Sequence, residues 1–327
     1  MSADLTALPK VHLHVHLEST LRWETVRELA DSHGLPIPER PLDQLAFNGF
    51  PAFADYDRLI RGCLREPADF TRAAREFCAD EAAQGTRYAE VTFTAAAHGE
   101  RLGDPEMPLE AVLAGLADGM RDNDIECRVR LDHSRRRSLE RAWETLRLAR
   151  RYDEVIGLGL AGDEAHPAAP FAEVFAAARD SGLHVVHHAG ETVGPHSIRE
   201  ALDLGYTERL GHGIRVLDDP ELVAVVRDRG IPLEVCPTSN VILGLAPSLA
   251  AHPLPRLRDA GLAVTLNTDI PNVTGTSLTD EFARARTAFG FTDPELAQLN
   301  HAAIDASFAP EATKARLHRQ TDAWLTT

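Results

Sequence analysis

Three histidines alternate near the start of the chain, in the stretch LPKVHLHVHLEST at residues 8–20. They are His12, His14 and His16. Alternate residues of a β-strand point to the same face, so a strand over residues 10–16 would direct all three imidazoles to one side. Neutral imidazole is a common ligand of zinc and related divalent ions. The spacing therefore indicates either a three-histidine metal site or two ligands with a third histidine beside them.

Polar residues also follow several later apolar runs, as HHAGE at 187–191, GHG at 211–213, CPTSN at 236–240 and NTD at 267–269. Three histidines and one carboxylate suit a borderline divalent ion, and a catalytic site keeps one position open for water. Any one of these histidines alone is more often an ordinary core or surface residue. Together, four residues at strand ends favour a metal site: His14, His16, His188 and Asp269.

Two further residues near these ligands could move protons. Glu191 lies three residues after His188, and a carboxyl group in a dry pocket can hold a proton at neutral pH and deliver it. His212 could orient or deprotonate a water molecule whose pKa a metal ion lowers. Both also have structural alternatives, because Glu191 could cap the following helix and His212 could satisfy a buried backbone group.

Eight short apolar runs alternate with amphipathic helical segments along the chain. The expected strands cover residues 10–16, 87–93, 126–131, 155–160, 183–188, 209–213, 232–237 and 262–268. Helical patterns between them include residues 69–85, 170–182 and 219–230, and the last two end in glycine. Strands that alternate with helices predict a parallel sheet.

Eight such units in 327 residues favour an α/β fold of the closed (β/α)8 TIM-barrel type, with its active site at the carboxyl ends of the strands. A doubly wound open sheet is the alternative, but no glycine-rich phosphate loop follows the first strand. We expect residues 1–327 to form a single barrel domain. The stretch at about 18–70 is too long for a loop, and we expect it to form a helical lid over the barrel mouth.

The net charge of −16 disfavours nucleic acid and anionic membranes as partners. No apolar run approaches the ~20 residues of a membrane-spanning helix. The four cysteines are scattered without a CxxC pair, and the first residues lack the pattern of a signal peptide. These features predict a cytoplasmic protein, and they do not identify its partner.

The motifs PKxxLHxHLE, LAGDE, HHAGE, RLGHG, CPTSN and NTD, in that order, resemble the adenosine and adenine deaminase family of the amidohydrolase superfamily. The resemblance extends from about residue 8 to about residue 307. It implies one divalent ion, with zinc expected, held by the four ligands His14, His16, His188 and Asp269. The implied reaction is hydrolytic loss of the 6-amino group of an adenosine-like purine, which yields an inosine-like product and ammonia.

The resemblance also implies the roles of the remaining site residues. Glu191 matches the residue that protonates ring N1 of the purine, and His212 matches the histidine that works with the attacking water. Asp269 is implied to be catalytic as well as a ligand. Gly162 of LAGDE matches a glycine whose backbone N–H meets ring N3, and Glu18 lies where family members place an acidic residue near the ribose or the outer pocket.

One departure from the family pattern concerns the substrate. The family usually has two aspartates after strand eight, whereas this chain reads NTDIP, with Ile270 at the second position. In the family that aspartate contacts purine N7, and isoleucine can neither donate nor accept a hydrogen bond. A lost buried hydrogen bond costs about 1–3 kcal/mol. An alternative substrate is therefore another amino-heterocycle, such as aminodeoxyfutalosine, a modified adenosine or a natural-product intermediate.

Two other functions stay open from the sequence. The chain could be a catalytically inert deaminase-like binding protein, although Glu191 and the full ligand set are present. It could also be an amide or phosphotriester hydrolase, but those relatives more often use a carboxylated lysine between two metals, and the fourth and fifth strands contain no lysine. His12 is expected to be structural, since the resemblance brings the third histidine ligand from strand five.

Overall fold

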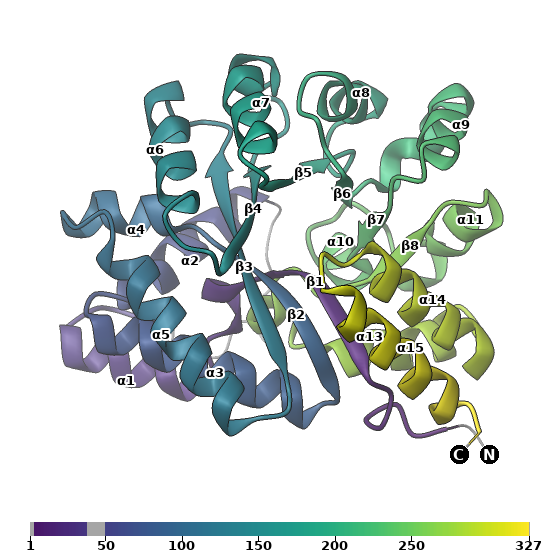
Figure 1. Ribbon diagram of the computed structural model, residues 1–327, viewed down its shortest axis with the longest axis horizontal. Coiled ribbons are helices and arrows are strands. Elements are labelled where there is room, and N and C mark those ends of the chain that lie inside the picture. Colours follow the sequence, from purple (N-terminus) through teal and green to yellow (C-terminus); the bar gives the residue numbers. More distant parts are fainter. Residues whose placement is uncertain (1–2, 38–49, 327) are drawn as a thin grey trace.

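Eight parallel strands form one barrel in the computed structural model, which describes residues 3–37 and 50–326. Each strand pairs with the next along the chain, so the order is β1 to β8 (Figure 1). The strands are β1 (Lys10–His16), β2 (Thr86–Phe93), β3 (Glu126–Ser134), β4 (Val155–Ala161), β5 (His184–Ala189), β6 (Arg209–His212), β7 (Leu233–Val235) and β8 (Val264–Leu266). The predicted (β/α)8 TIM barrel is confirmed.

Helices follow the strands and surround the barrel, as Figure 1 shows. Before β2 come the 3-10 turn Leu17–Thr20 and the helices α1 (Trp23–His33), α2 (Phe50–Cys63) and α3 (Pro67–Ala83). Between β2 and β6 come α4 (Ala95–Leu102), α5 (Met107–Asp122), α6 (Leu139–Ala149), α7 (Ala172–Asp180) and α8 (Pro195–Asp203). The rest are α9 (Pro220–Asp228), α10 (Pro237–Ile242), α11 (Leu254–Asp259), α12 (Pro271–Thr274), α13 (Leu278–Ala288), α14 (Asp293–Ala306) and α15 (Glu311–Trp324).

The three helical patterns singled out in the sequence correspond to α3, α7 and α9, each within a few residues of its predicted ends. At the start of α9, the carboxylate of Asp219 accepts hydrogen bonds from two backbone N–H groups of the first turn, which is the usual chemistry of a helix cap. Gly230 follows α9 with φ of +65°, a conformation that glycine adopts without strain. Strands β7 and β8 are shorter than predicted, because the chain turns into α10 and into the NTD segment.

The barrel closes where β1 meets the segment after β8. The backbone N–H of His16 donates to the carbonyl of Asp269 (3.0 Å), and the N–H of Asp269 donates to the carbonyl of His14 (3.0 Å). These bonds form a parallel bridge between Val15 and Asp269. Closure therefore holds the backbone of two predicted ligands beside the backbone of a third.

A β-bulge divides β1 between its first and second histidine. His12 lies opposite Ala89 of β2, but Val15 lies opposite Val91, so β1 carries one residue more than its partner over this interval. The amide oxygen of Asn267 accepts hydrogen bonds from the backbone N–H groups of both Leu13 and His14, at 2.9 Å each. An extra residue reverses the alternation of side chains. The prediction that all three histidines face one side is therefore wrong.

His12 instead points away from the other two histidines, towards α3. Its Nδ1 lies 3.0 Å from Oε2 of Glu81, and its Nε2 lies 3.0 Å from the hydroxyl of Thr268. All three side chains are buried or nearly so, and the contact ties the outer face of β1 to α3 and to the segment after β8. The expectation that His12 is structural agrees with these contacts.

Part of the predicted lid at 18–70 can be described, whereas residues 38–49 of it lie outside the described residues. The described part consists of the 3-10 turn, α1, α2 and the first residues of α3. Asp57 and Arg61 of α2 line a cavity at the barrel mouth. Among the described residues, no helix combines the length and apolar character needed to cross a membrane. All four cysteines are buried and free.

Candidate metal centre and active site

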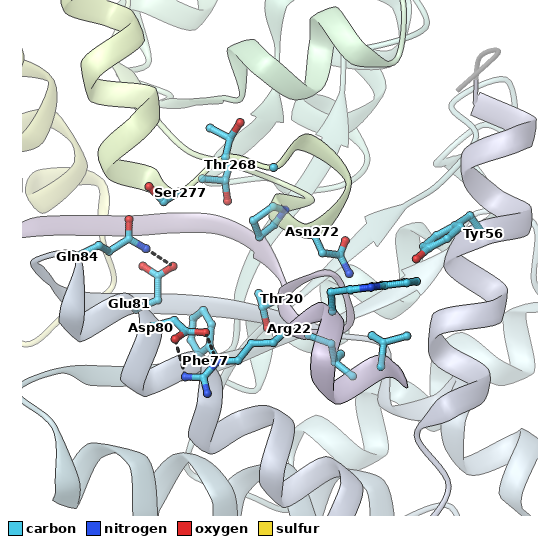
Figure 2. Close-up of a pocket in the computed structure, with 16 residues that line it drawn as sticks. Thr20, Arg22, Tyr56, Phe77, Asp80, Glu81, Gln84, Thr268, Asn272 and Ser277 are labelled. Atoms are coloured by element: carbon cyan, nitrogen blue, oxygen red, sulfur yellow. Dashed lines mark hydrogen bonds and ion pairs between the residues drawn. The ribbon is translucent and has the colours of Figure 1, made fainter. Parts of the chain in front are cut away.

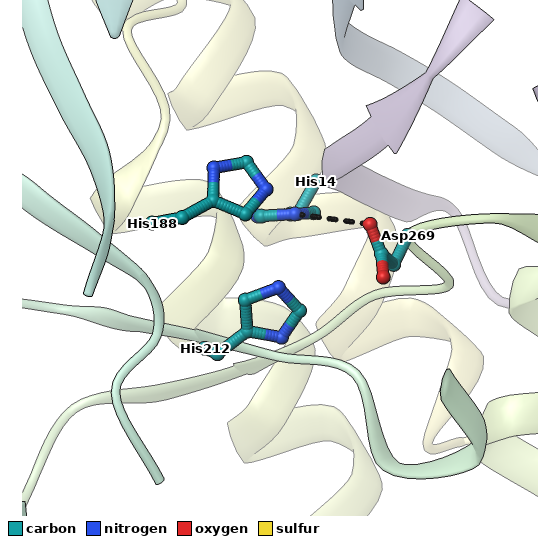
Figure 3. A group of neighbouring side chains, drawn as sticks. All are labelled: His14, His188, His212 and Asp269. Carbon is teal, nitrogen blue, oxygen red and sulfur yellow. Dashed lines mark ion pairs between the residues drawn. The ribbon is translucent and has the colours of Figure 1, made fainter. Parts of the chain in front are cut away.

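Three histidines and an aspartate meet at the carboxyl ends of the strands. Ligand atoms of His14, His188, His212 and Asp269 all lie within 4.8 Å of one another (Figure 3). His16 joins them, since its Nε2 lies 3.2 Å from Nε2 of His188. The structure thus brings together all four predicted ligands, and it adds His212 to the group.

The hydrogen bonds on the far side of each ring fix which nitrogen is free. Nδ1 of His14 lies 2.8 Å from the carboxylate of Glu234, and Nδ1 of His188 lies 3.1 Å from the carbonyl of Leu160. Carboxylates and carbonyls only accept, so each Nδ1 carries the proton and each Nε2 presents a lone pair. Nε2 of His14 is buried with no hydrogen-bond partner. An unpartnered buried lone pair among like neighbours fits a bound cation.

The spacing of the atoms favours His16 over His212 as the fourth ligand. Nε2 of His14 and Nε2 of His16 each lie 3.4 Å from Oδ1 of Asp269. Adjacent nitrogen and oxygen ligands bound to one ion at about 2.0–2.1 Å lie roughly 3–3.5 Å apart. Each of the two histidines therefore already has the separation from Asp269 that two ligands of one ion require.

Buried charges support this arrangement from beneath. Oε1 of Glu234 accepts a hydrogen bond from Arg209 (2.7 Å), and Arg130 lies 3.5 Å from its Oε2. These guanidinium groups outweigh the effect of burial and hold the pKa of Glu234 well below its usual range. Burial acts to lower the pKa of His14, but the nearby carboxylates of Asp269 and Glu234 outweigh burial and raise that pKa. The site therefore attracts positive charge.

Backbone strain is concentrated at the same place. Among the described residues, only Tyr206, His212 and Asp269 are non-glycine residues with positive φ. This conformation is uncommon for residues with a side chain and tends to occur at functional sites. Gly211 serves the site differently, because a Cβ there would lie 2.9 Å from the His14 ring. Packing of the His14 ring thus excludes larger residues at position 211.

The loop that carries Glu191 is held by Glu164 of LAGDE. The Glu164 carboxylate accepts hydrogen bonds from the backbone N–H groups of Gly190 (2.8 Å), Glu191 (2.9 Å) and Thr192 (3.3 Å). Burial, followed by the charges of Asp269 and Glu164, raises the pKa of Glu191. Its carboxyl group lines the cavity beside the ligands, and one of its oxygens has no hydrogen-bond partner. Glu191 therefore has the environment of a proton donor.

A chain of hydrogen bonds orients His212. The backbone N–H of Leu254 donates to Nδ1 of His252, and Nε2 of His252 lies 3.2 Å from the amide oxygen of Asn240. The amide nitrogen of Asn240 lies 3.4 Å from Nδ1 of His212. A backbone N–H can only donate, so Nδ1 of His252 accepts and its Nε2–H donates to the Asn240 oxygen. The Asn240 amide N–H then donates to Nδ1 of His212.

The neutral His212 ring consequently carries its proton on Nε2, the nitrogen 3.6 Å from Glu191. Burial, followed by the charge of His14, lowers the pKa of His212 to about 3. A neutral ring with a fixed tautomer can position a water molecule or substrate atom.

A cavity of about 210 Å³ contains these groups. Gly162, Ile270 and Glu191 all line it, with His16, His188, His212 and Asp269 at its inner end. Glu18 does not line the cavity. Its buried carboxylate accepts a hydrogen bond from the backbone N–H of Thr94 (3.1 Å) and lies 3.2 Å from Nε2 of His98. Glu18 is thus not placed at the cavity surface, where the predicted substrate contact would require it. Its carboxylate instead supports the cavity wall through Thr94 and His98.

A second, larger cavity of about 390 Å³ lies outside the barrel, between the 3-10 turn, α3 and the segment after α12 (Figure 2). Arg22 and Asp80 form an ion pair at its edge, and Gln84 donates to Glu81, the partner of His12. None of the predicted ligands lines it. The smaller cavity inside the barrel is therefore the candidate active site.

Sequence reasoning missed the residues that orient the ligands. Glu234, Asn240 and His252 are joined to the site only through the fold, and the sequence PLEVCP does not show which side of β7 faces the barrel axis. Ser239 belongs to the same group, since its hydroxyl donates to Oδ2 of Asp269 at 2.6 Å. The sequence did contain a signal for Glu164, because the LAGDE motif places two acidic residues directly after the end of a strand.

Comparison with known proteins agrees with the geometry. The family model described as adenosine deaminase matches residues 9–324. A putative adenosine/adenine deaminase of Streptomyces coelicolor is 37% identical over 98% of each chain. The crystal structure of an adenine deaminase from Arthrobacter aurescens superposes with a TM-score of 0.92, at 32% identity over 98% of this chain and 99% of that one.

Two more distant structures carry ligands. An amidohydrolase from Burkholderia ambifaria with bound zinc has a TM-score of 0.87 and 28% identity over 99% of this chain and 94% of that one. An Arabidopsis protein named ADAL, complexed with GMP, has a TM-score of 0.88 and 28% identity over 98% of each chain.

Fold and site together define a barrel hydrolase of the amidohydrolase type that acts on C–N bonds. Within this class, the chain belongs to the adenosine deaminase family. Its relatives support deamination of aminopurine-like small molecules.

The difference between His12 and His14 can be measured directly. His14→Ala removes a ligand, and we expect the purified variant to lose most of its bound metal. His12→Ala should retain the metal of the parent protein, because His12 contacts Glu81 and Thr268 instead. It should be less stable by about 1–3 kcal/mol, since Glu81 loses its buried partner. Metal analysis and urea unfolding give both results. Metal loss in His12→Ala would contradict the bulged geometry of β1.

Glu164→Ala tests whether the Glu191 loop is held by one carboxylate. Removing the acceptor leaves the backbone N–H groups of Gly190 and Glu191 without partners, so the proton donor loses its fixed position. We expect kcat to fall at least tenfold while metal content stays at the parental level. Glu173→Ala, on the neighbouring α7, is a control that should change neither. Full activity in Glu164→Ala would contradict this role.

Proposed function

We propose that this enzyme is a zinc-dependent aminohydrolase that removes the 6-amino group of an adenosine-like purine, with water as the second substrate. One observation carries the proposal. Glu191, whose pKa is raised by burial, lines the same cavity as the histidine and aspartate ligands. A proton donor beside a cation site is the combination that hydrolytic loss of ammonia requires.

His14, His16, His188 and Asp269 would hold the ion, and His212 would stay free. A divalent ion in this site lowers the pKa of a water molecule and thereby supplies a nucleophile at neutral pH. Three histidines and a carboxylate are donors that suit zinc. The zinc-bound amidohydrolase of the same fold supports that choice of metal.

The residues of the chain then perform the proton transfers. Glu191 donates its proton to ring N1, which makes C6 more electrophilic. His212, neutral and oriented through Asn240, directs its Nε2–H towards the oxygen that adds to C6. As the new C–O bond forms and the C–N bond breaks, one proton of the attacking water passes to the amino group, which leaves as ammonia. The other proton of that water returns to Glu191. The backbone N–H of Gly162, which lines the cavity, is the proposed donor to ring N3.

The identity of the purine is the open part of this proposal. The relatives include adenine and adenosine deaminases, and the ADAL structure carries a nucleotide. Ile270 is buried and lines the cavity, where it offers N7 no hydrogen bond. Another amino-heterocycle is therefore the second candidate. An inert binding protein is a weaker one, because every proposed catalytic group lines the cavity or touches it. A cytoplasmic location and a single domain stay predictions.

An ammonia-release screen tests the reaction class. We expect the zinc-loaded enzyme to release ammonia from at least one of adenine, adenosine, deoxyadenosine, AMP, N6-modified adenosines or aminodeoxyfutalosine. Glu191→Gln should retain zinc and lose roughly 10²–10⁴-fold in kcat on that substrate, because the amide cannot deliver the proton. Zinc-loaded protein that releases no ammonia from this panel, or Glu191→Gln with normal kcat, would refute the proposal.

Ile270→Asp tests the contribution of the N7 contact. Purine N7 only accepts hydrogen bonds, so the new carboxyl group would contact it as a protonated donor, and we expect kcat/KM on adenosine to rise by roughly ten- to a hundredfold. Ile270→Asn is the matched control, because it has similar size and a hydrogen-bond donor but no charge. An unchanged or lower kcat/KM in both variants, with zinc retained, would show that N7 is recognised by another group.

A further inference from the structure

A third cavity, of about 540 Å³, adjoins the active site and has an unusual charge for this protein. The described residues that line it include five arginines and only two carboxylates, Asp57 and Glu100, whereas the whole chain has a net charge of −16. The arginines are Arg58, Arg61, Arg101, Arg137 and Arg141. A concentration of positive charge against the sign of the protein marks a place for an anion.

The arginine cavity adjoins the active-site cavity. Both are lined by Asp57 and Arg61 of α2, by Thr94 after β2, and by Ser134 at the end of β3. Arg136, from the same SRRRS segment as Arg137, lines the active-site cavity itself. A ligand whose reactive ring lies beside Glu191 could therefore extend past Arg61 and Ser134 into the arginine cavity.

Two of the arginines are already paired with carboxylates. Nε of Arg61 lies 2.7 Å from Asp57, and Nη1 of Arg141 lies 2.8 Å from Glu100. Arg137 is different, because it is exposed and its guanidinium has no ion-pair partner among the described residues. Arg136 is also exposed and has no ion-pair partner among the described residues. These two groups can bind an anion without giving up an internal partner.

Arg101 is fixed in place without being neutralised. Its guanidinium donates to the backbone carbonyls of Arg61 and Leu64 and to Nδ1 of His98 (3.0 Å). Since Nδ1 accepts, Nε2 of His98 carries the proton and donates to the buried carboxylate of Glu18 (3.2 Å). Glu18 thus anchors the wall of the arginine cavity, and no carboxylate among the described residues pairs directly with Arg101.

We propose that the arginine cavity binds the phosphate group of the substrate, so that the enzyme acts on a 6-aminopurine nucleoside monophosphate. The inference rests on the proposed aminohydrolase function. Guanidinium groups bind phosphate through paired, charge-assisted hydrogen bonds. A free base beside Glu191 would leave the arginines unused, whereas a nucleotide carries its phosphate on the side of the molecule away from the reacting amino group. Arg137 is the main specificity residue, and Arg101 and Arg141 form the walls.

The test compares AMP, adenosine, adenine and adenosine-5′-carboxylate with the zinc-loaded enzyme. We expect kcat/KM for AMP to exceed that for adenosine by at least roughly tenfold, the effect of one charge-assisted hydrogen bond or more. Arg137→Ala should lower the ratio of the AMP and adenosine values by roughly five- to tenfold, mainly through KM. Added salt should raise KM for AMP more than KM for adenosine.

Arg150→Ala is the matched control. Arg150 is also exposed and without an ion-pair partner among the described residues, but it follows the other end of α6. The Arg150→Ala variant should leave all kinetic constants unchanged. Equal kcat/KM for AMP and adenosine, or equal effects of Arg137→Ala and Arg150→Ala, would overturn the inference while the deaminase function stands. A preference for the carboxylate over AMP would also overturn it.

Binding of IMP by calorimetry separates this inference from the proposed function. If no compound releases ammonia, the proposed function fails, but the phosphate site can still be judged. Weaker binding of IMP, by at least roughly fivefold, to Arg137→Ala than to Arg150→Ala would support it. Equal binding of inosine and IMP to the parent protein would overturn it.

Discussion

Two backbone hydrogen bonds between β1 and Asp269 are the constraint on which the site depends. They close the barrel, and they hold His14 and His16 each at a ligand-like separation from Asp269. The bulge that precedes them turns His14 inward while His12 remains outside. Asn267 stabilises this irregular backbone, because its one amide oxygen accepts hydrogen bonds from two backbone N–H groups. Closure of the barrel therefore also places three of the four proposed ligands.

The site also requires several charged and titratable groups to be buried close to one another. Below the ligands, Arg209 and Arg130 compensate Glu234, so that its carboxylate can orient His14. Above them, Glu164 holds the Glu191 loop through backbone bonds and also raises the pKa of Glu191. Each reactive group thus has a partner that fixes its position without neutralising it. Such preorganisation allows a rigid barrel to aim proton donors at a fixed point in the cavity.

Much of this was predictable from the sequence. Strand–helix alternation predicted the barrel, and polar residues after five apolar runs predicted which end carries the site. The alternation rule failed at His12, because a one-residue bulge is set by tertiary hydrogen bonds from Asn267, 254 residues away from Leu13. The positions of Glu234, Asn240 and His252 could not be predicted for the same reason. Glu18 was assigned to the substrate by resemblance, but its contacts with Thr94 and His98 depend on how α4 packs.

Anomalous diffraction from crystals of the metal-loaded protein would locate the ion directly. We predict a single strong peak among Nε2 of His14, His16 and His188 and a carboxylate oxygen of Asp269, with His212 and Glu191 outside the coordination shell. A peak coordinated by His212 in place of His16, or an ion bound elsewhere in a catalytically active protein, would contradict it.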